Sequence, residues 1–347
     1  MARKQVKRTT GPLYPEHPLS EHQHRLKRAR KIMKEDRLDA LVFSRNVNVF
    51  YATGSRFVFV GFDAPLALAP QSAAIFTQDA DIYCQRFGPF DSDAVGLHTT
   101  VSESMEFYDD ELELVNILSD YGIGKGHRIG IEWGPGLCTG INPIKFWELK
   151  KRIINELGAE LVDATTTIWK ITAIKSTLEI ERMRVAVAAA ARAMERIYEE
   201  IDIGMREVDV ARRVSTFMLE EGADKITHAQ VMSVGQGPNL LSNDALDRKI
   251  EKGFVHLDLG CKYRRYGSDI NRGIFLGRAP TKDEEKLYGC RLGVNEVMDK
   301  MIRPGVCMDD VLQAMNEYAQ SCGCIMKEIG GYLFGGHGIG LEPYQHP

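Results

Sequence analysis

The sequence lacks the features that define membrane and secreted proteins. No stretch approaches the roughly 18 consecutive apolar residues needed to cross a bilayer. The basic segment Arg3–Arg8 is followed by Thr9–Pro12 rather than by an apolar run, so it lacks the hydrophobic region of a signal peptide. These absences predict a protein that neither spans a membrane nor carries a secretory signal.

Excess positive charge and a cysteine framework are also missing. The 347 residues contain 44 Lys and Arg against 48 Asp and Glu, a net charge of −4, which gives no basic surplus for a nucleic-acid backbone. The seven cysteines are odd in number and scattered, which argues against a disulfide framework and for a reducing compartment. We therefore expect a cytoplasmic protein that does not bind nucleic acid.

What is present is an ordinary globular composition and a length that suits two domains. Strand-like runs such as Leu38–Phe43 alternate with helical stretches up to about residue 170, which predicts an α/β domain over residues 1–170. An Ala-rich helix with Ser176 and Glu179 as its capping box, a second helix, a hairpin and two more helices follow. This order predicts an α+β domain over residues 171–347.

Two aspartates mark the hairpin predicted between Phe254 and Leu276. With a turn centred between Tyr263 and Arg264, Asp258 and Asp269 lie directly opposite each other, with Cβ atoms ~5 Å apart on one face. Like charges at that distance repel unless a cation lies between them, and a pair of divalent metals would supply it and generate hydroxide from bound water. The alternative is that both aspartates are exposed residues beside the turn, although Asp258 lies in an otherwise apolar run.

Several histidines accompany this pair. By strand alternation His256 lies on the same face as the aspartates, either as an extra ligand or as a hydrogen-bonded structural residue. Glycines on both sides of His337 allow close backbone packing and leave one imidazole projecting, as a metal ligand or a general acid–base requires. A turn histidine without a function has the same local pattern. Four further histidines are isolated and are interpreted as structural or solvated: His22, His24, His98 and His228.

Together these segments resemble the pita-bread metallopeptidase family that contains prolidase, aminopeptidase P and creatinase. Arg25–Gly54 is similar to the opening of the N-terminal domain, and Ile171–Ala186 is similar to the linker and first helix of the catalytic domain. Asp258 and Asp269, with HGIGL later in the chain, match the family's metal-carboxylate hairpin and its following motif. The resemblance implies a creatinase-type N-terminal domain, a pita-bread catalytic domain and a homodimer.

The resemblance also implies a ligand set. Asp258 would be the bidentate ligand of one metal, Asp269 the bridging ligand and His337 the third ligand, around two divalent transition metals drawn from Mn, Fe, Co and Zn. The family completes its site with two glutamates on later strands, and those positions lie beyond Pro347. We therefore expect a chain truncated at its C-terminus, with an incomplete catalytic domain.

Three positions depart from the family pattern and bear on the substrate. Ser242 stands where the substrate-side histidine is expected, Tyr344 stands where the final motif has a second histidine, and Asn271 replaces a threonine of the hairpin. Ser242 and Tyr344, together with His346 two residues after Tyr344, are the candidates for catalytic or substrate-binding roles.

Three functions stay open on this basis. The first is a metal-dependent hydrolase in which metal-bound hydroxide attacks a C–N bond of a small peptide, such as a dipeptide, or of an amide. The second is a non-peptidase enzyme on the same fold, resembling creatinase or the dimethylsulfoniopropionate lyase, because the histidine pair is substituted. The third is a catalytically silent binding module, as in some chromatin- and ribosome-associated relatives.

Overall fold

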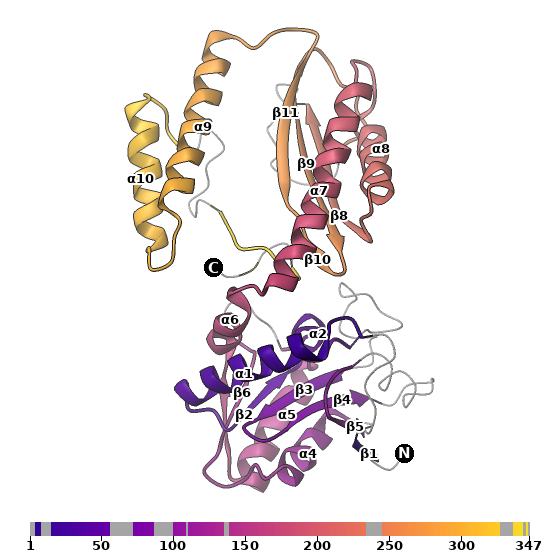
Figure 1. The fold of residues 1–347 in the computed structure, drawn as a ribbon, viewed down its shortest axis with the longest axis vertical. Helices are drawn as coiled ribbons and strands as arrows, with labels where there is room; N and C mark the ends of the chain where they lie inside the picture. The colour runs from indigo at the N-terminus through magenta and orange to yellow at the C-terminus, as the bar shows by residue number, and fades with distance from the viewer. Residues whose placement is uncertain are drawn as a thin grey trace. The chain divides into compact units, whose positions relative to one another are not determined.

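The computed structural model of the chain divides into two compact units, Met1–Lys175 and Ser176–Pro347 (Figure 1). The structure describes residues 4–7, 15–55, 72–86, 100–108, 110–134, 139–233, 245–326, 336–342 and 345. Residue 170, where the sequence pattern changes, lies within helix α6 (Thr165–Ala173), which belongs to the first unit.

A seven-stranded mixed sheet organises the first unit, in the order β1-β5-β4-β3-β2-β6-β7. The strands are β1 (Lys4–Lys7), β2 (Ala40–Phe43), β3 (Ser72–Thr77), β4 (Asp81–Arg86), β5 (Ser104–Tyr108), β6 (Arg128–Ile131) and β7 (Glu160–Asp163). The helices are α1 (Leu19–Glu35), α2 (Asn46–Thr53), α4 (Leu114–Asp120), α5 (Pro143–Arg152) and α6, with short 3-10 and π segments at Glu111–Glu113 and Ile153–Leu157. Strands β2 and β3 are buried at every position, as an internal strand covered on both faces requires. The predicted α/β character of this unit is confirmed.

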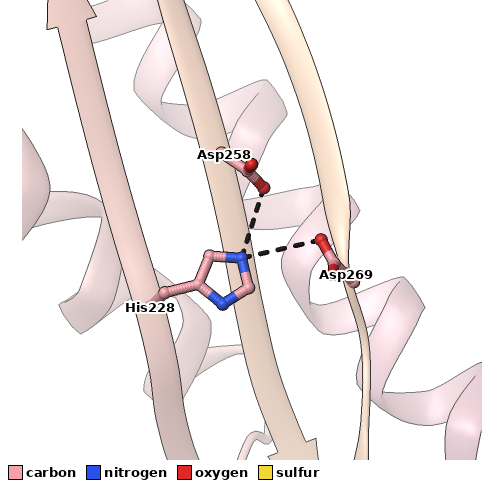
Figure 2. A group of neighbouring side chains, drawn as sticks. All are labelled: His228, Asp258 and Asp269. Carbon is pink, nitrogen blue, oxygen red and sulfur yellow. Dashed lines mark hydrogen bonds and ion pairs between the residues drawn. The ribbon is translucent and has the colours of Figure 1, made fainter. Parts of the chain in front are cut away.

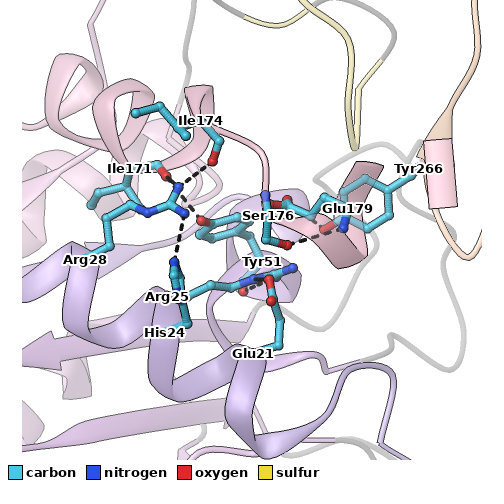
Figure 3. Close-up of polar contacts among 10 residues, drawn as sticks. All are labelled: Glu21, His24, Arg25, Arg28, Tyr51, Ile171, Ile174, Ser176, Glu179 and Tyr266. Carbon is cyan, nitrogen blue, oxygen red and sulfur yellow. Dashed lines mark hydrogen bonds and ion pairs between the residues drawn. The ribbon is translucent and has the colours of Figure 1, made fainter. Parts of the chain in front are cut away.

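Polar contacts of α1, among them those of a buried arginine, join three helices of the first unit (Figure 3). Arg25 of α1 is 1% exposed, pairs with Glu21 at 2.7 Å and donates through Nη1 to the Tyr51 carbonyl at 2.8 Å. The Tyr51 hydroxyl of α2 donates to the carbonyl of Ile171 in α6, and Arg28 of α1 donates to the same carbonyl. Because a buried charge is costly unless it is paired, these contacts fix the three helices against one another.

A buried carboxylate also connects β6 to the start of α2. Glu132 accepts hydrogen bonds through Oε1 from the backbone N–H groups of Ser44 and Arg45 at 2.9 and 2.8 Å, and from the Asn48 side chain at 3.4 Å. Burial raises the pKa of Glu132 above its ordinary value, against the lowering influence of these donors. The Glu132 carboxyl group therefore binds its proton more tightly in the folded protein than in the unfolded chain.

The substitution Glu132→Gln is expected to change how stability depends on pH. The wild-type protein loses stability as the pH rises from the ordinary value of 4.5 towards the raised pKa of the folded state, and the loss persists above it. The glutamine amide has no proton to lose in this range, so the stability of the variant relative to wild type should rise across that window. Urea unfolding followed by tryptophan fluorescence measures it, because Trp133, Trp147 and Trp169 all lie in the first unit. Parallel pH profiles would contradict the prediction.

The described part of the second unit is built on an antiparallel sheet. Its strands are β8 (Lys225–Ser233), β9 (Gly253–Tyr263), β10 (Tyr266–Gly267) and β11 (Ile270–Leu276). Strand β9 pairs with β8 on one side and with β10 and β11 on the other. Helices α7 (Thr177–Glu200) and α8 (Glu207–Glu220) pack on one face, where they share a core with the odd-numbered side chains Val255, Leu257 and Leu259 of β9. Because side chains alternate along a strand, the even-numbered positions of β9 face the other side.

Helices α9 (Lys282–Met301) and α10 (Met308–Ser321) follow the sheet and pack against each other around a separate apolar cluster. The helices and the sheet of this unit agree with the α+β pita-bread class that the sequence predicts. No helix in the described ranges combines the length and the apolar character needed to cross a membrane.

The hairpin turn lies one residue later than the sequence predicts. Arg264 and Arg265 are its central residues, with φ of 44° and 74°, which is typical of the type I′ turns that join twisted strands. Asp258 consequently pairs with Asn271, and the prediction that it lies directly opposite Asp269 is wrong. A turn without glycine or asparagine gives no signal that distinguishes adjacent positions. Because Asp269 is two residues from Asn271, it stays on the same face and is a diagonal neighbour of Asp258.

Candidate metal centre

Polar side chains from three neighbouring strands meet on the face of the second sheet opposite α7 and α8 (Figure 2). Asp258 lies on β9, His228 lies on β8 across from Gly260, and Asp269 directly precedes β11. The three residues supply ligand-type atoms that all lie within 4.8 Å of one another.

The contacts within this group are short. His228 Nε2 lies 3.2 Å from Asp258 Oδ1 and 3.7 Å from Asp269 Oδ1. His337 Nε2 lies 3.4 Å from Asp269 Oδ2, so the glycine-flanked histidine joins the same cluster. The four side chains are 17 to 28% exposed, which leaves the cluster accessible to an ion from solvent.

The electrostatics of the cluster favour a cation. Burial raises the pKa of Asp269, and the charge of Asp258 raises it further against the opposing influence of His228 and His337. Burial alone lowers the pKa of His228, but the hydrogen bond to Asp258 and the charges of both aspartates outweigh it, so the pKa is raised. Two carboxylates this close are therefore stabilised by positive charge between them.

A β-bulge directs His228 into the cluster. The register between β8 and β9 shifts between Ile226 and His228, which leaves Thr227 as the extra residue. Ile226 pairs with Cys261 of the core face, and His228 pairs with Gly260 of the opposite face. Without the shift, His228 would lie on the core face, so the bulge re-aims this side chain as bulges near active sites do.

The interpretation of His228 as an isolated residue is wrong. Its ring contacts both aspartates of the predicted pair. The alternation of polar His228 and Gln230 around apolar positions in Lys225–Ser233 indicates a strand, and this signal was available in the sequence. The bulge that decides which face His228 occupies has no such signal.

The remaining predicted site residues divide into two groups. His256 lies on the same face as Asp258, two positions along β9, and burial lowers its pKa against the charge of Asp258. Its role as an extra ligand stays a prediction. Ser242, Tyr344 and His346 lie outside the described residues.

The donor set fits a divalent transition metal. Carboxylate and imidazole groups together suit manganese, iron, cobalt and zinc. The mutual repulsion of Asp258 and Asp269 is the condition that a bound cation relieves. The fold and this cluster therefore define a two-domain protein of the metallohydrolase class, with an α/β unit before a pita-bread unit that carries a carboxylate–imidazole centre.

Comparisons with known families agree with this class. Residues 181–347 match the profile of Metallopeptidase family M24, and residues 25–174 match the Creatinase/Prolidase N-terminal domain. The chain therefore belongs to the pita-bread metallopeptidase family of prolidase, aminopeptidase P and creatinase, and the predicted resemblance is confirmed.

Individual relatives match across both units. The Xaa-Pro dipeptidase of Pyrococcus horikoshii is 27% identical over 334 residues, which cover 93% of this chain and 83% of that protein. The crystal structure of a prolidase from the same organism has a TM-score of 0.71 at 24% identity, with 93% of this chain and 84% of that chain covered. The N-terminal domain of FACT complex subunit SPT16 from chickpea has a TM-score of 0.67 at 16% identity over 94% of this chain and 82% of that chain. The fold is thus shared widely, and activity must be argued from the site.

Proposed function

We propose that this protein is a metal-dependent dipeptidase that hydrolyses the C–N bond of Xaa-Pro dipeptides. The observation that carries the proposal is the convergence of Asp258, Asp269 and His337 on one face of the sheet, within a family of metallopeptidases. The Xaa-Pro dipeptidase that matches 93% of the chain supports the substrate class.

Asp258, Asp269 and His337 would hold two divalent ions in this proposal. Such ions, when bound, supply a Lewis acid and lower the pKa of a coordinated water to near neutrality. Asp269 lies between the two imidazoles, so it can balance charge on both sides of the centre. His337 Nδ1 lies 3.0 Å from the Gly338 carbonyl, and a hydrogen bond donated there directs Nε2 towards Asp269.

A cytoplasmic homodimer with two metals per chain completes the proposal, and the family resemblance is its support. The molecular mass of the purified protein in solution tests the dimer, and its metal content tests the two metals per chain.

Removal of metal is expected to abolish hydrolysis of Xaa-Pro dipeptides. The purified protein is dialysed against a chelator, assayed for release of free proline from Ala-Pro and Met-Pro, and assayed again after addition of Mn²⁺, Co²⁺ or Zn²⁺. Activity should disappear on chelation and return with metal, because Asp258 and Asp269 by themselves provide no electrophile.

Two other results would replace the proposal. Release of urea from creatine, or of dimethyl sulfide from dimethylsulfoniopropionate, without dipeptide hydrolysis would assign the non-peptidase chemistry. A folded protein that contains no bound metal and turns over none of these substrates would be a binding module.

A further inference from the structure

We infer that His228 is itself a metal ligand, through Nε2, on the Asp258 side of the centre. The inference rests on the proposed function and deepens it, because the family resemblance assigns ligand roles to Asp258, Asp269 and His337 but not to His228. A metal-bound His228 would give the centre a second imidazole, which shifts its metal preference from manganese towards zinc, iron and cobalt.

The distances around His228 are those of neighbouring ligands. Two ligands of one ion, each about 2.1 Å from it, lie roughly 3.0 to 3.5 Å apart in octahedral or tetrahedral coordination. His228 Nε2 lies 3.2 Å from Asp258 Oδ1, within that range, and 3.7 Å from Asp269 Oδ1, just outside it. The nitrogen and the two oxygens thus lie within 4.8 Å of one another, and Figure 2 marks the two contacts of the nitrogen.

The second nitrogen of the ring has the partner that a ligand histidine needs. Nδ1 of His228 lies 3.2 Å from Thr227 Oγ1. When Nδ1–H donates to this hydroxyl, the Nε2 lone pair points at the carboxylates of Asp258 and Asp269. A lone pair facing two carboxylates is repulsive unless a cation lies between them, and a metal ion supplies that cation.

The backbone around His228 is shaped to admit the ring. A Cβ atom on Gly260 would lie 2.2 Å from His228 Cε1 and 2.4 Å from Thr227 Oγ1, so only glycine leaves room for both side chains. The bulge at Thr227 brings His228 to this clear position. Two independent features of neighbouring strands therefore serve the placement of one imidazole between the two aspartates.

The competing explanation is that His228 is a protonated counter-ion of the aspartates. The two explanations predict different metal preferences. An added imidazole ligand strengthens binding of zinc, iron and cobalt more than that of manganese, which favours oxygen ligands. A counter-ion competes with every divalent metal alike, so its removal would leave the preference unchanged or strengthen binding.

Calorimetric titration of Zn²⁺ and Mn²⁺ into the metal-free protein tests the inference. In His228→Gln the zinc affinity is expected to fall at least tenfold, with a smaller change for manganese, so that the zinc-to-manganese preference drops. Gly260→Ala is expected to act in the same direction, because it displaces the ring without removing it. His24→Gln, at a histidine that contacts Arg28 in the first unit, is the matched control and should leave both affinities unchanged.

Each outcome decides the inference. Unchanged or tighter zinc binding in a folded His228→Gln variant, as judged by circular dichroism, would overturn it, whether or not the enzyme hydrolyses dipeptides. A wild-type protein that binds neither metal would overturn it together with the proposed function. Lower zinc affinity in the variant, combined with no Xaa-Pro hydrolysis by the wild type, would support the ligand and reject the substrate.

Discussion

Replacement of Glu207 by alanine is expected to lower the free energy of unfolding by about 3 kcal/mol. The Glu207 side chain is 1% exposed and sits at the first residue of α8. It accepts hydrogen bonds from the backbone N–H groups of Ser233 and Leu246 at 2.6 and 3.2 Å, and from Arg248 Nε at 2.9 Å. Alanine would leave these donors without their acceptor, and buried unpaired donors cost about 1–3 kcal/mol each.

The contact extends into the backbone on both sides of the carboxylate. The N–H groups of Glu207 and Val208 donate to the carbonyls of Arg248 and Leu246, and Arg248 Nη2 donates to the Ser233 carbonyl. Glu207 therefore ties the end of β8, the strand that carries His228, to the residues that lead towards β9. Loss of this carboxylate should loosen the pairing of β8 and β9, the two strands that carry His228 and Asp258.

Urea unfolding by circular dichroism measures the loss, and hydrogen exchange locates it. Exchange in Glu207→Ala should accelerate at Ser233 and Leu246 in particular. Asp209→Ala is the matched control, because Asp209 lies two residues further along the same helix with a half-exposed side chain. Its exposed pair with Arg212 contributes about 0–1 kcal/mol. Equal stability of the two variants would show that Glu207 has no special structural role.

The sequence predicts those parts of the structure that depend on local patterns. The capping box at Ser176–Glu179 is present, because the pattern satisfies backbone donors within one helical turn. Strand alternation places Asp258 and Asp269 on one face, because a turn centre that moves by one whole residue shifts the strand pairing by two residues and keeps the side-chain alternation. The predicted face of the candidate site is therefore correct, although the predicted pairing of the two aspartates is not.

The parts that the sequence does not predict depend on choices between strands. The YRRY turn has no glycine or asparagine to fix its centre, so Asp258 pairs with Asn271 rather than with the predicted partner. The bulge at Thr227 is a property of the β8–β9 ladder rather than of either strand alone. His228 reaches the aspartates through that bulge and through the space above Gly260, so its role emerges only from three strands together.

Asp269→Asn is expected to give the largest loss of activity of any single change in the chain. Asp269 Oδ1 lies 3.7 Å from His228 and its Oδ2 lies 3.4 Å from His337, so both oxygens face the centre. Asparagine keeps the shape of the side chain but removes its charge and replaces one oxygen ligand by an amide that donates. A Lewis-acid metal contributes several kcal/mol to the reaction, so kcat/KM for Xaa-Pro dipeptides should fall roughly 10³-fold or more.

Metal analysis beside the dipeptide assay separates the causes of that loss. Asp269→Asn should lose bound metal together with activity, whereas Asp283→Asn, the same chemical change at an exposed position of α9, should lose neither. An Asp269→Asn variant that keeps wild-type metal content and activity would place the metal centre elsewhere in the protein. A variant that keeps its metal but loses activity would limit Asp269 to a role in orienting substrate or water, since the ions would then be held by Asp258 and the histidines alone.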